Sequence, residues 1–273
     1  FCKFDKCLTF TASTYNVLFK ELRSRGFKVK ALEKFGHDPR YPVTNNWPHL
    51  VQQLADFALA KQSDGEPAFL VGHSLGGMLS LMLAAQYPRL AHAVVMVDAP
   101  ALGGLRAKAL HLSKTLSLTS KISPGAISRK RRNTWHSAEE VNAHFLSKKV
   151  FARWDPQVLN DYVLYGTHEE KTDEGVQRVL SFDRNIETQI YNSVPHNLER
   201  LLKKYPLACP VSLVAARHSN EMRLAGFDFS QKVTKGRICT IDGTHLVPME
   251  KPMVTAAAIE ASILNMLSLK ASK

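Results

Sequence analysis

A serine between glycines, at the junction of an apolar run and a helical run, constrains this chain more than any other feature. The segment is Gly72-His73-Ser74-Leu75-Gly76, preceded by the apolar run 69–71 and followed by the Leu-, Met- and Ala-rich run 77–85. A G-x-S-x-G pattern between strand and helix is typical of a nucleophile elbow, a tight turn that raises a serine oxygen above a sheet. The alternative is a bystander serine in a glycine-rich turn, but the flanking runs favour Ser74 as a nucleophile.

Short apolar runs alternate with helical patterns on both sides of the middle of the chain. Near-continuous apolar strands separated by helices indicate an α/β fold with a mostly parallel central sheet and helices on both faces. The expected strands are 28–32, 68–71, 93–97, 211–215 and 237–241. The expected helices are 47–60, 79–85 and 253–267.

The alternation stops in the middle of the chain, between Asp98 and Pro206. A chain of 273 residues is long enough for one large domain with an inserted subdomain. We predict an α/β core over residues 1–104 and 206–273 and a mostly helical cap over residues 105–205.

Residues 105–153, within the expected cap, carry eleven Lys or Arg and two acidic residues. One interpretation is a lid that attracts anionic acyl substrates or phosphate-bearing thioesters, and a second is peripheral contact with an anionic membrane. The third is a solvated helical face, as most charge runs are. The aromatic residues of this region line an acyl pocket or form the core of the cap; they are Trp135, Phe145, Phe151 and Trp154.

Composition restricts partners and cofactors. The net charge of +12 favours anionic partners, but no nucleic-acid-binding module is recognisable, so we expect no nucleic acid partner. No apolar run is long enough for a transmembrane helix, and the first residues do not resemble a signal peptide. No cofactor motif or metal-binding spacing occurs, so we expect no cofactor and no metal. The pattern leaves the oligomeric state open.

The four cysteines, Cys2, Cys7, Cys209 and Cys239, match no metal-binding spacing. In a chain of this length we interpret them as free thiols of a reducing compartment, which predicts a cytoplasmic location. Cys209 and Cys239 adjoin apolar strand-like runs, so we expect both to be small core residues.

A histidine follows the last expected strand, in the segment Asp242-Gly243-Thr244-His245. The order serine, acid, histidine along the chain is the one used by serine hydrolases that carry a nucleophile elbow. An imidazole in this loop can take the serine proton and return it to the leaving group. We therefore predict His245 as the general base.

The chain resembles capped α/β-hydrolases of the esterase, lipase and C–C hydrolase group. The matching segments are 71–77, Val95-Met96-Val97-Asp98-Ala99-Pro100 and 243–252. The resemblance covers the core and implies cofactor-free acyl-enzyme chemistry at Ser74. It also implies an acid about ten residues after a proline such as Pro210, a position that falls near Ser219, where this chain has no Asp.

The triad acid therefore has two candidates. Glu221 is the carboxylate nearest to the position that the resemblance implies, and a glutamate can orient a triad histidine. Asp98, at the end of the preceding strand, is the alternative, since a few relatives keep their acid there. The sequence favours Glu221. Asp242 and Glu250 are close to His245 in the chain, but we expect them to orient the loop or to be exposed.

The resemblance also implies an oxyanion hole made of two backbone amides. One is the N–H of Leu75, after the nucleophile, and the other comes from the stretch 6–10, where Phe10 stands at the donor position. Relatives carry His-Gly there and this chain does not, which favours a weak or inactive enzyme as an alternative. We predict a carboxylic-ester hydrolase acting on small or medium acyl substrates; the alternatives are C–C bond or thioester hydrolysis, or a non-catalytic ligand-binding protein.

Overall fold

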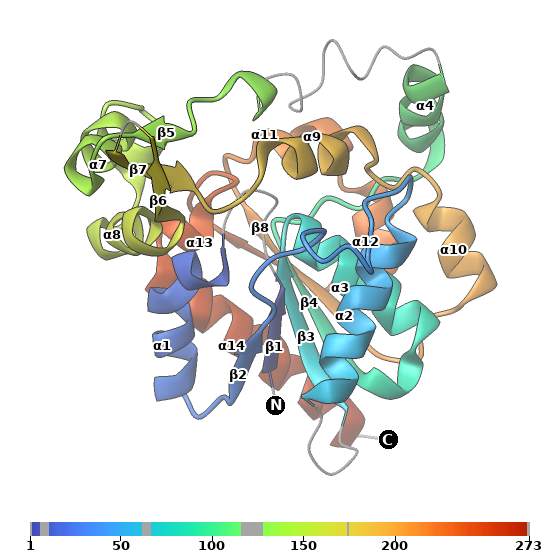
Figure 1. Ribbon diagram of the computed structural model, residues 1–273. Coiled ribbons are helices and arrows are strands. Elements are labelled where there is room, and N and C mark those ends of the chain that lie inside the picture. The colour runs from blue at the N-terminus through green and yellow to red at the C-terminus, as the bar shows by residue number, and fades with distance from the viewer. Residues whose placement is uncertain (1, 6–10, 62–66, 116–127, 174, 272–273) are drawn as a thin grey trace.

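The central element of the computed structural model is a six-stranded sheet (Figure 1). The structure describes residues 2–5, 11–61, 67–115, 128–173 and 175–271. The strand order is β2-β1-β3-β4-β8-β9, and every pair of neighbours is parallel. This confirms the predicted parallel sheet. The strands are β1 Cys2–Asp5, β2 Val29–Ala31, β3 Ala68–His73, β4 Ala91–Val97, β8 Val211–Ala216 and β9 Ile238–Ile241.

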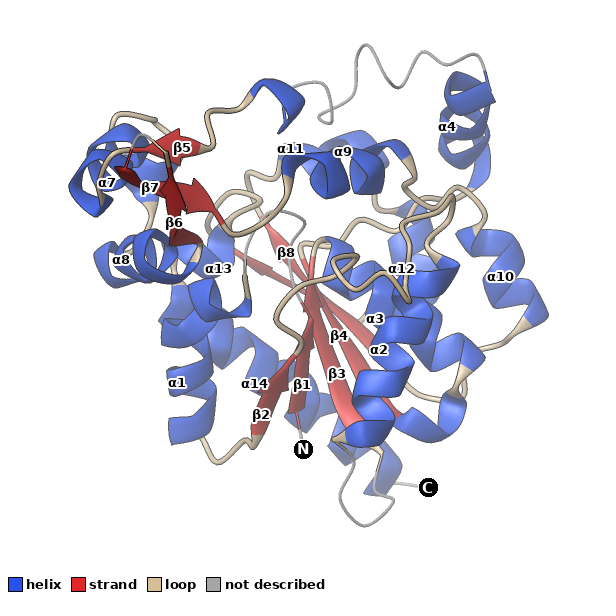
Figure 2. Ribbon diagram, viewed as in Figure 1, coloured by secondary structure: helices blue, strands red, loops and turns tan. Residues whose placement is uncertain are grey.

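Helices cover both faces of this sheet (Figure 2). Helices α1 (Asn16–Ser24) and α14 (Pro252–Ala271) pack on one face, and α2 (Pro48–Ala60) and α3 (Leu75–Gln86) pack on the other. Strand β4 shows why the sequence reads as continuously apolar: Val95 and Val97 enter one core, whereas Val94 and Met96 enter the other. Burial on both faces removes the polar alternation of a half-exposed strand.

Most of the described residues between β4 and β8 lie beyond the carboxyl ends of the strands, whereas the last helix of this segment packs beside α3 (Figure 1). Its described helices are α4 Gly104–Thr115, α7 Ala138–Leu146, η3 Phe151–Arg153, α8 Pro156–Tyr165, α9 Arg184–Asn192 and α10 Leu198–Lys204. It also contains an antiparallel sheet that the sequence did not predict, of order β5-β7-β6. Its strands are β5 Thr134–Trp135, β6 Thr167–Thr172 and β7 Gly175–Leu180. Strand β6 is exposed at all but its first residue, so no hydrophobic pattern marks it.

The aromatic residues of this segment pack against one another. Trp135, Phe145 and Trp154 are buried, and the Phe145 and Phe151 rings lie 4.6 Å apart between centroids. Tyr162 completes the group, with its ring 5.0 Å from that of Phe145. The same buried cluster includes residues of α1 and α14, so these aromatics belong to a core that continues into the main sheet and is not confined to this segment.

The remaining short helices are η1 Ala12–Tyr15, η2 Pro88–Leu90, α11 Asn220–Ala225, α12 Asp228–Thr234 and α13 Val247–Glu250. The expectation that Cys239 is a core residue is wrong: it is exposed, because β9 is an edge strand whose middle residues face outward. Cys209 is half-buried, and Cys7 lies outside the described residues. Within the described part of the chain, no helix combines the length and apolarity needed to cross a membrane.

Candidate active site

Ser74 occupies a strained turn between β3 and α3. Its φ of 54° and ψ of −117° lie in a region that side-chain-bearing residues rarely adopt. The two flanking chain segments approach so closely that only glycine fits at two positions. A Cβ on Gly72 would lie 2.1 Å from the backbone carbon of Gly76, and one on Gly77 would lie 2.4 Å from the Ala99 Cβ. These glycines allow the turn that presents the Ser74 hydroxyl at the carboxyl end of β3.

His245 lies in the loop between β9 and α13 and reaches Ser74 across 171 positions of the chain. Its Nε2 is 3.0 Å from the Ser74 Oγ, and its Nδ1 is 2.7 Å from Oδ2 of Asp98. Because a carboxylate only accepts hydrogen bonds, Nδ1 carries the proton and Nε2 is left to accept the serine hydroxyl proton. This is the tautomer that a general base needs.

Asp98 is fully buried at the end of β4, where its φ is 39°. Three groups donate hydrogen bonds to its carboxylate: the amide of Ala216 (2.7 Å, to Oδ1), the hydroxyl of Ser219 (2.5 Å, to Oδ2) and Nδ1 of His245. Such donors offset the cost of burying an ionised carboxylate and hold it in one orientation.

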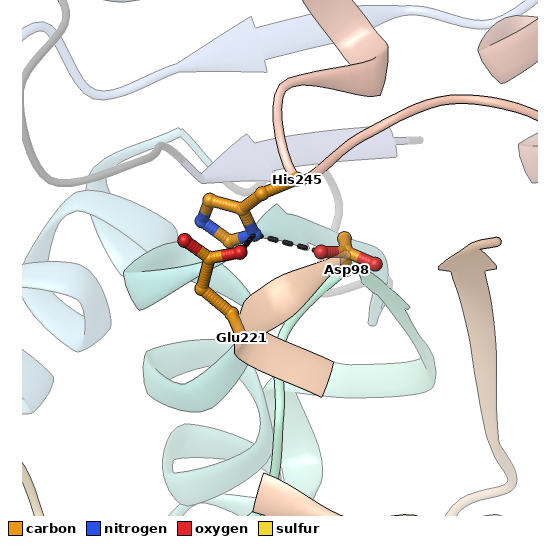
Figure 3. Close-up of side chains that lie close together, drawn as sticks. All are labelled: Asp98, Glu221 and His245. Atoms are coloured by element: carbon orange, nitrogen blue, oxygen red, sulfur yellow. Dashed lines mark hydrogen bonds and ion pairs between the residues drawn. The ribbon is translucent and has the colours of Figure 1, made fainter. Parts of the chain in front are cut away.

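Glu221 approaches the same ring nitrogen from the first turn of α11 (Figure 3). Its Oε2 is 3.8 Å from Nδ1 of His245, which is beyond hydrogen-bond range, and its side chain is 47 % exposed. The sequence favoured Glu221 over Asp98, whereas the structure places Asp98 within hydrogen-bond distance and Glu221 outside it. Solvent around Glu221 also weakens its electrostatic effect on the imidazole.

His73 fixes the backbone of the histidine loop. Its buried Nε2 is 2.7 Å from the carbonyl oxygen of His245, and its Nδ1 is 2.9 Å from the hydroxyl of Tyr15. Because a carbonyl can only accept, Nε2 donates, and in the neutral ring Nδ1 accepts from the phenol. The elbow thus supplies both Ser74 and the side chain that anchors the loop of its partner histidine.

Two acidic residues near His245 in the chain are engaged elsewhere. Glu250 accepts hydrogen bonds from the amide and hydroxyl of Thr244, at 2.9 and 2.6 Å, and so braces the loop. Asp242 is exposed and pairs with Lys251 and His218, which hold the pKa of its carboxyl below the usual range. Both arrangements agree with the expectation that these residues orient the loop or are exposed.

The structure describes one of the two candidate oxyanion-hole donors, Leu75, and does not describe the other. Leu75 is the first residue of α3, where backbone amides lack acceptors within their own helix and the helix dipole is positive. Phe10 lies outside the described residues.

Sequence reasoning missed His73, Tyr15 and Ser219 as parts of the site. Ser219 had a local signal, since a serine three residues before Met222 suits a helix N-cap, and its Oγ accepts from the Met222 amide at 3.2 Å. Its bond to Asp98 depends on the pairing of β4 with β8, which no local pattern shows.

Known proteins share this fold. The profile of the alpha/beta hydrolase family matches residues 7–258. A monoglyceride lipase homolog of monkeypox virus is 22% identical over 243 residues, which cover 73% of this chain and 87% of that protein.

Two solved structures superpose over nearly the whole chain. E-2-(acetamidomethylene)succinate hydrolase does so with a TM-score of 0.71 and 20% identity, covering 96% of this chain and 90% of that one. An esterase of M. tuberculosis does so with a TM-score of 0.67 and 18% identity, covering 96% and 84%. At these identities the superpositions show the fold alone.

Proposed function

The chain belongs to the alpha/beta hydrolase family, and from that premise we propose that it is a serine hydrolase that cleaves carboxylic esters of small or medium acyl groups. One observation carries the proposal. A single imidazole, that of His245, lies 3.0 Å from the Ser74 hydroxyl through one nitrogen and 2.7 Å from a buried carboxylate through the other. Nucleophile, base and acid in this relation are the parts that acyl transfer requires.

The proposed reaction has two halves. Ser74 Oγ attacks the ester carbonyl while Nε2 of His245 takes its proton, which forms a tetrahedral oxyanion. We assign the amide of Leu75 as one donor to that oxyanion. The oxyanion collapses, the alcohol leaves with the proton from His245, and a water molecule activated by the same nitrogen hydrolyses the acyl-enzyme.

We assign the acid role to Asp98 and a secondary electrostatic role to Glu221. Support for Asp98 comes from its 2.7 Å contact with His245 and its burial, which strengthens its attraction for the imidazolium formed in each half-reaction. Glu221, at 3.8 Å and half-exposed, adds a smaller attraction of the same sign.

We further propose that residues 105–205 act as a cap that shapes the acyl site. The support is that most of the described residues of this range lie beyond the carboxyl ends of the strands (Figure 1). Ser74 and Asp98 directly follow the carboxyl ends of β3 and β4. Thioester and C–C bond hydrolysis would use the same serine, so a substrate panel distinguishes them from ester hydrolysis.

The test is hydrolysis of chromogenic short-chain esters by wild type, Ser74→Ala and Ser80→Ala. Ser80 is a buried serine of α3 outside the triad and serves as the matched control. We expect turnover by wild type and Ser80→Ala and none by Ser74→Ala, with a fluorophosphonate probe labelling the first two only. Equal turnover by wild type and Ser74→Ala, or no labelling at Ser74, would contradict the proposal.

A further inference from the structure

A cavity of about 750 Å³ lies between α4 and α10 and contains none of the triad residues. Helices α4 and α10 lie next to each other in Figure 1, with α4 beyond the carboxyl edge of the sheet. Helix α4 begins at Gly104, six positions after Asp98. The described residues that line the cavity are Gly104, Ala107, Lys108, His111, His196, Asn197, Glu199, Arg200 and Lys203.

Positive charge exceeds negative charge in this lining. Lys108, Arg200 and Lys203 are cationic, and the one carboxylate among the lining residues described is Glu199. That carboxylate is already engaged, since it pairs with Lys203 at 3.2 Å and accepts from the amide of Gly104 at 3.1 Å. The charges of Lys108 and Arg200 are therefore not balanced by Glu199.

Two imidazoles form part of the wall. The rings of His111 and His196 stack with centroids 4.4 Å apart. The Nδ1 of His196 is buried and has no hydrogen-bond partner among the residues that the structure describes. A buried polar nitrogen without a partner is costly, so His196 brings an unsatisfied hydrogen-bonding group in a side chain that lines the cavity.

The lowered pKa values of His196 and Lys114 agree with an excess of positive charge around the cavity. Burial lowers the pKa of the His196 imidazole, and neighbouring basic groups lower it further; those groups are Lys114, His111 and Arg200. Burial also lowers the pKa of Lys114 to about 8, although its ammonium donates to Asn45 Oδ1 and to the carbonyl of Val194.

We propose that the cavity between α4 and α10 is a binding site for a phosphate group, bound by Arg200 and Lys108 with an imidazole N–H from His196. A guanidinium, an ammonium and an imidazole are charge-assisted donors, and a phosphate offers several acceptor oxygens to receive them together. A carboxylate, with two oxygens and one charge, would leave part of the positive charge unbalanced. The site does not depend on the proposed esterase activity.

The first experiment is calorimetric titration of the whole chain with inorganic pyrophosphate at low ionic strength. We expect saturable binding by wild type, weakened at least about tenfold in Arg200→Ala and in His196→Asn. The matched control is Lys204→Ala, which removes one positive charge from the same helix but from a residue outside the lining. If Lys204→Ala binds pyrophosphate as wild type does and all variants unfold at the wild-type temperature, the weaker binding of the other variants is due to the cavity.

The pH dependence gives a second test, with sulfate as an anion that does not titrate in the range used. An anion stabilises protonated His196 and so raises its pKa, hence sulfate should bind more tightly as pH falls from about 8 to about 6. The groups facing His196 are Lys114 and His111 from α4 and Arg200 from α10. The slope should be smaller in His196→Asn.

A competition arm distinguishes a free phosphate from the phosphate group of a larger substrate. If the group belongs to a substrate, pyrophosphate slows hydrolysis of a phosphate-bearing thioester and not of an uncharged ester; if the ligand is a separate anion, neither rate changes. Both results agree with the proposed site. Absence of pyrophosphate binding at millimolar concentration, or equal affinities of wild type, Arg200→Ala and His196→Asn, would overturn it.

Discussion

Replacing Asp98 by asparagine changes one charge at the proposed triad and keeps nearly the same side-chain shape. The asparagine oxygen can still accept from the Ala216 amide, while its NH₂ group takes the place of Oδ2 beside His245. Since an NH₂ group donates, Nδ1 of the imidazole must then accept, and the ring proton moves to Nε2. In that tautomer His245 cannot take the proton of Ser74.

The size of the effect follows from the distances. Nδ1 of His245 and Oδ2 of Asp98 are 2.7 Å apart. With charge centres about 4 Å apart and an effective dielectric constant of about 20, the carboxylate stabilises the imidazolium by about 4 kcal/mol. This corresponds to a fall in kcat of about 10³-fold, and the altered tautomer adds to it; the equivalent change in a serine protease triad costs about 10⁴-fold.

The matched control is Glu221→Gln, which removes the second carboxylate near the same nitrogen. Its oxygen is 3.8 Å away and its side chain is 47 % exposed. A water-like dielectric limits its contribution to about 1 kcal/mol, so we expect kcat to fall by no more than about fivefold. Initial rates on one chromogenic ester give both values, and thermal unfolding shows whether each variant keeps its fold.

The double variant tests whether Glu221 can replace Asp98. If Glu221 partly replaces Asp98, the kcat of Asp98→Asn/Glu221→Gln should be lower than the value obtained by multiplying the fold-reductions of the two single variants. A folded Asp98→Asn protein with wild-type kcat, or a Glu221→Gln protein as impaired as Asp98→Asn, would refute the assignment of the acid.

Three further predictions concern the loop of His245, the turn at Ser74 and the segment between β4 and β8. His73→Asn removes the 2.7 Å bond to the carbonyl of His245 and should lower kcat about tenfold with little change in KM, measured by steady-state kinetics. Gly77→Ala places a methyl group 2.4 Å from the Cβ of Ala99 and should lower the free energy of unfolding by about 1–3 kcal/mol in urea titrations. Burial raises the pKa of Tyr162 to about 12. The neutral phenol therefore stabilises the fold below about pH 10, and this contribution is lost as pH rises to about 12. The loss of stability over that interval should be smaller in Tyr162→Phe.

The strands that the sequence marks most clearly are those in which both faces are buried, whereas the expected strands 28–32 and 237–241 correspond to the partly exposed edge strands β2 and β9. The expected strand 93–97 corresponds to β4, Ala91–Val97, and 211–215 corresponds to β8, Val211–Ala216. Their apolar runs are long enough to stand out without help from tertiary contacts. Strand β1 was not predicted, because Cys-Lys-Phe-Asp is short and carries two charges. It forms a strand because it pairs with a neighbour on each side, β2 and β3.

The site residues differ in the same way: some are marked by a local sequence pattern, and others depend on tertiary contacts. Ser74 could be predicted because the elbow is a local pattern of glycines between a strand and a helix. The acid could not be decided locally, because a carboxylate at 98 and one at 221 both follow core strands. The distance of each from His245 depends on register, and β4 pairs with β8 so that Val97 lies opposite Val214.

That register gives a physical reason for placing the acid on Asp98. Parallel neighbours end at the same edge of a sheet, so the residue after β4 and the loop after β8 share one place. Ser219 stands near the position where the resemblance puts the acid, and its hydroxyl donates to Asp98 at 2.5 Å instead. A serine there supports a carboxylate on the adjacent strand, whereas a second buried carboxylate at 219 would repel it. In this chain, therefore, the carboxylate that contacts Nδ1 of His245 follows β4, and the loop after β8 contributes a serine that donates to it.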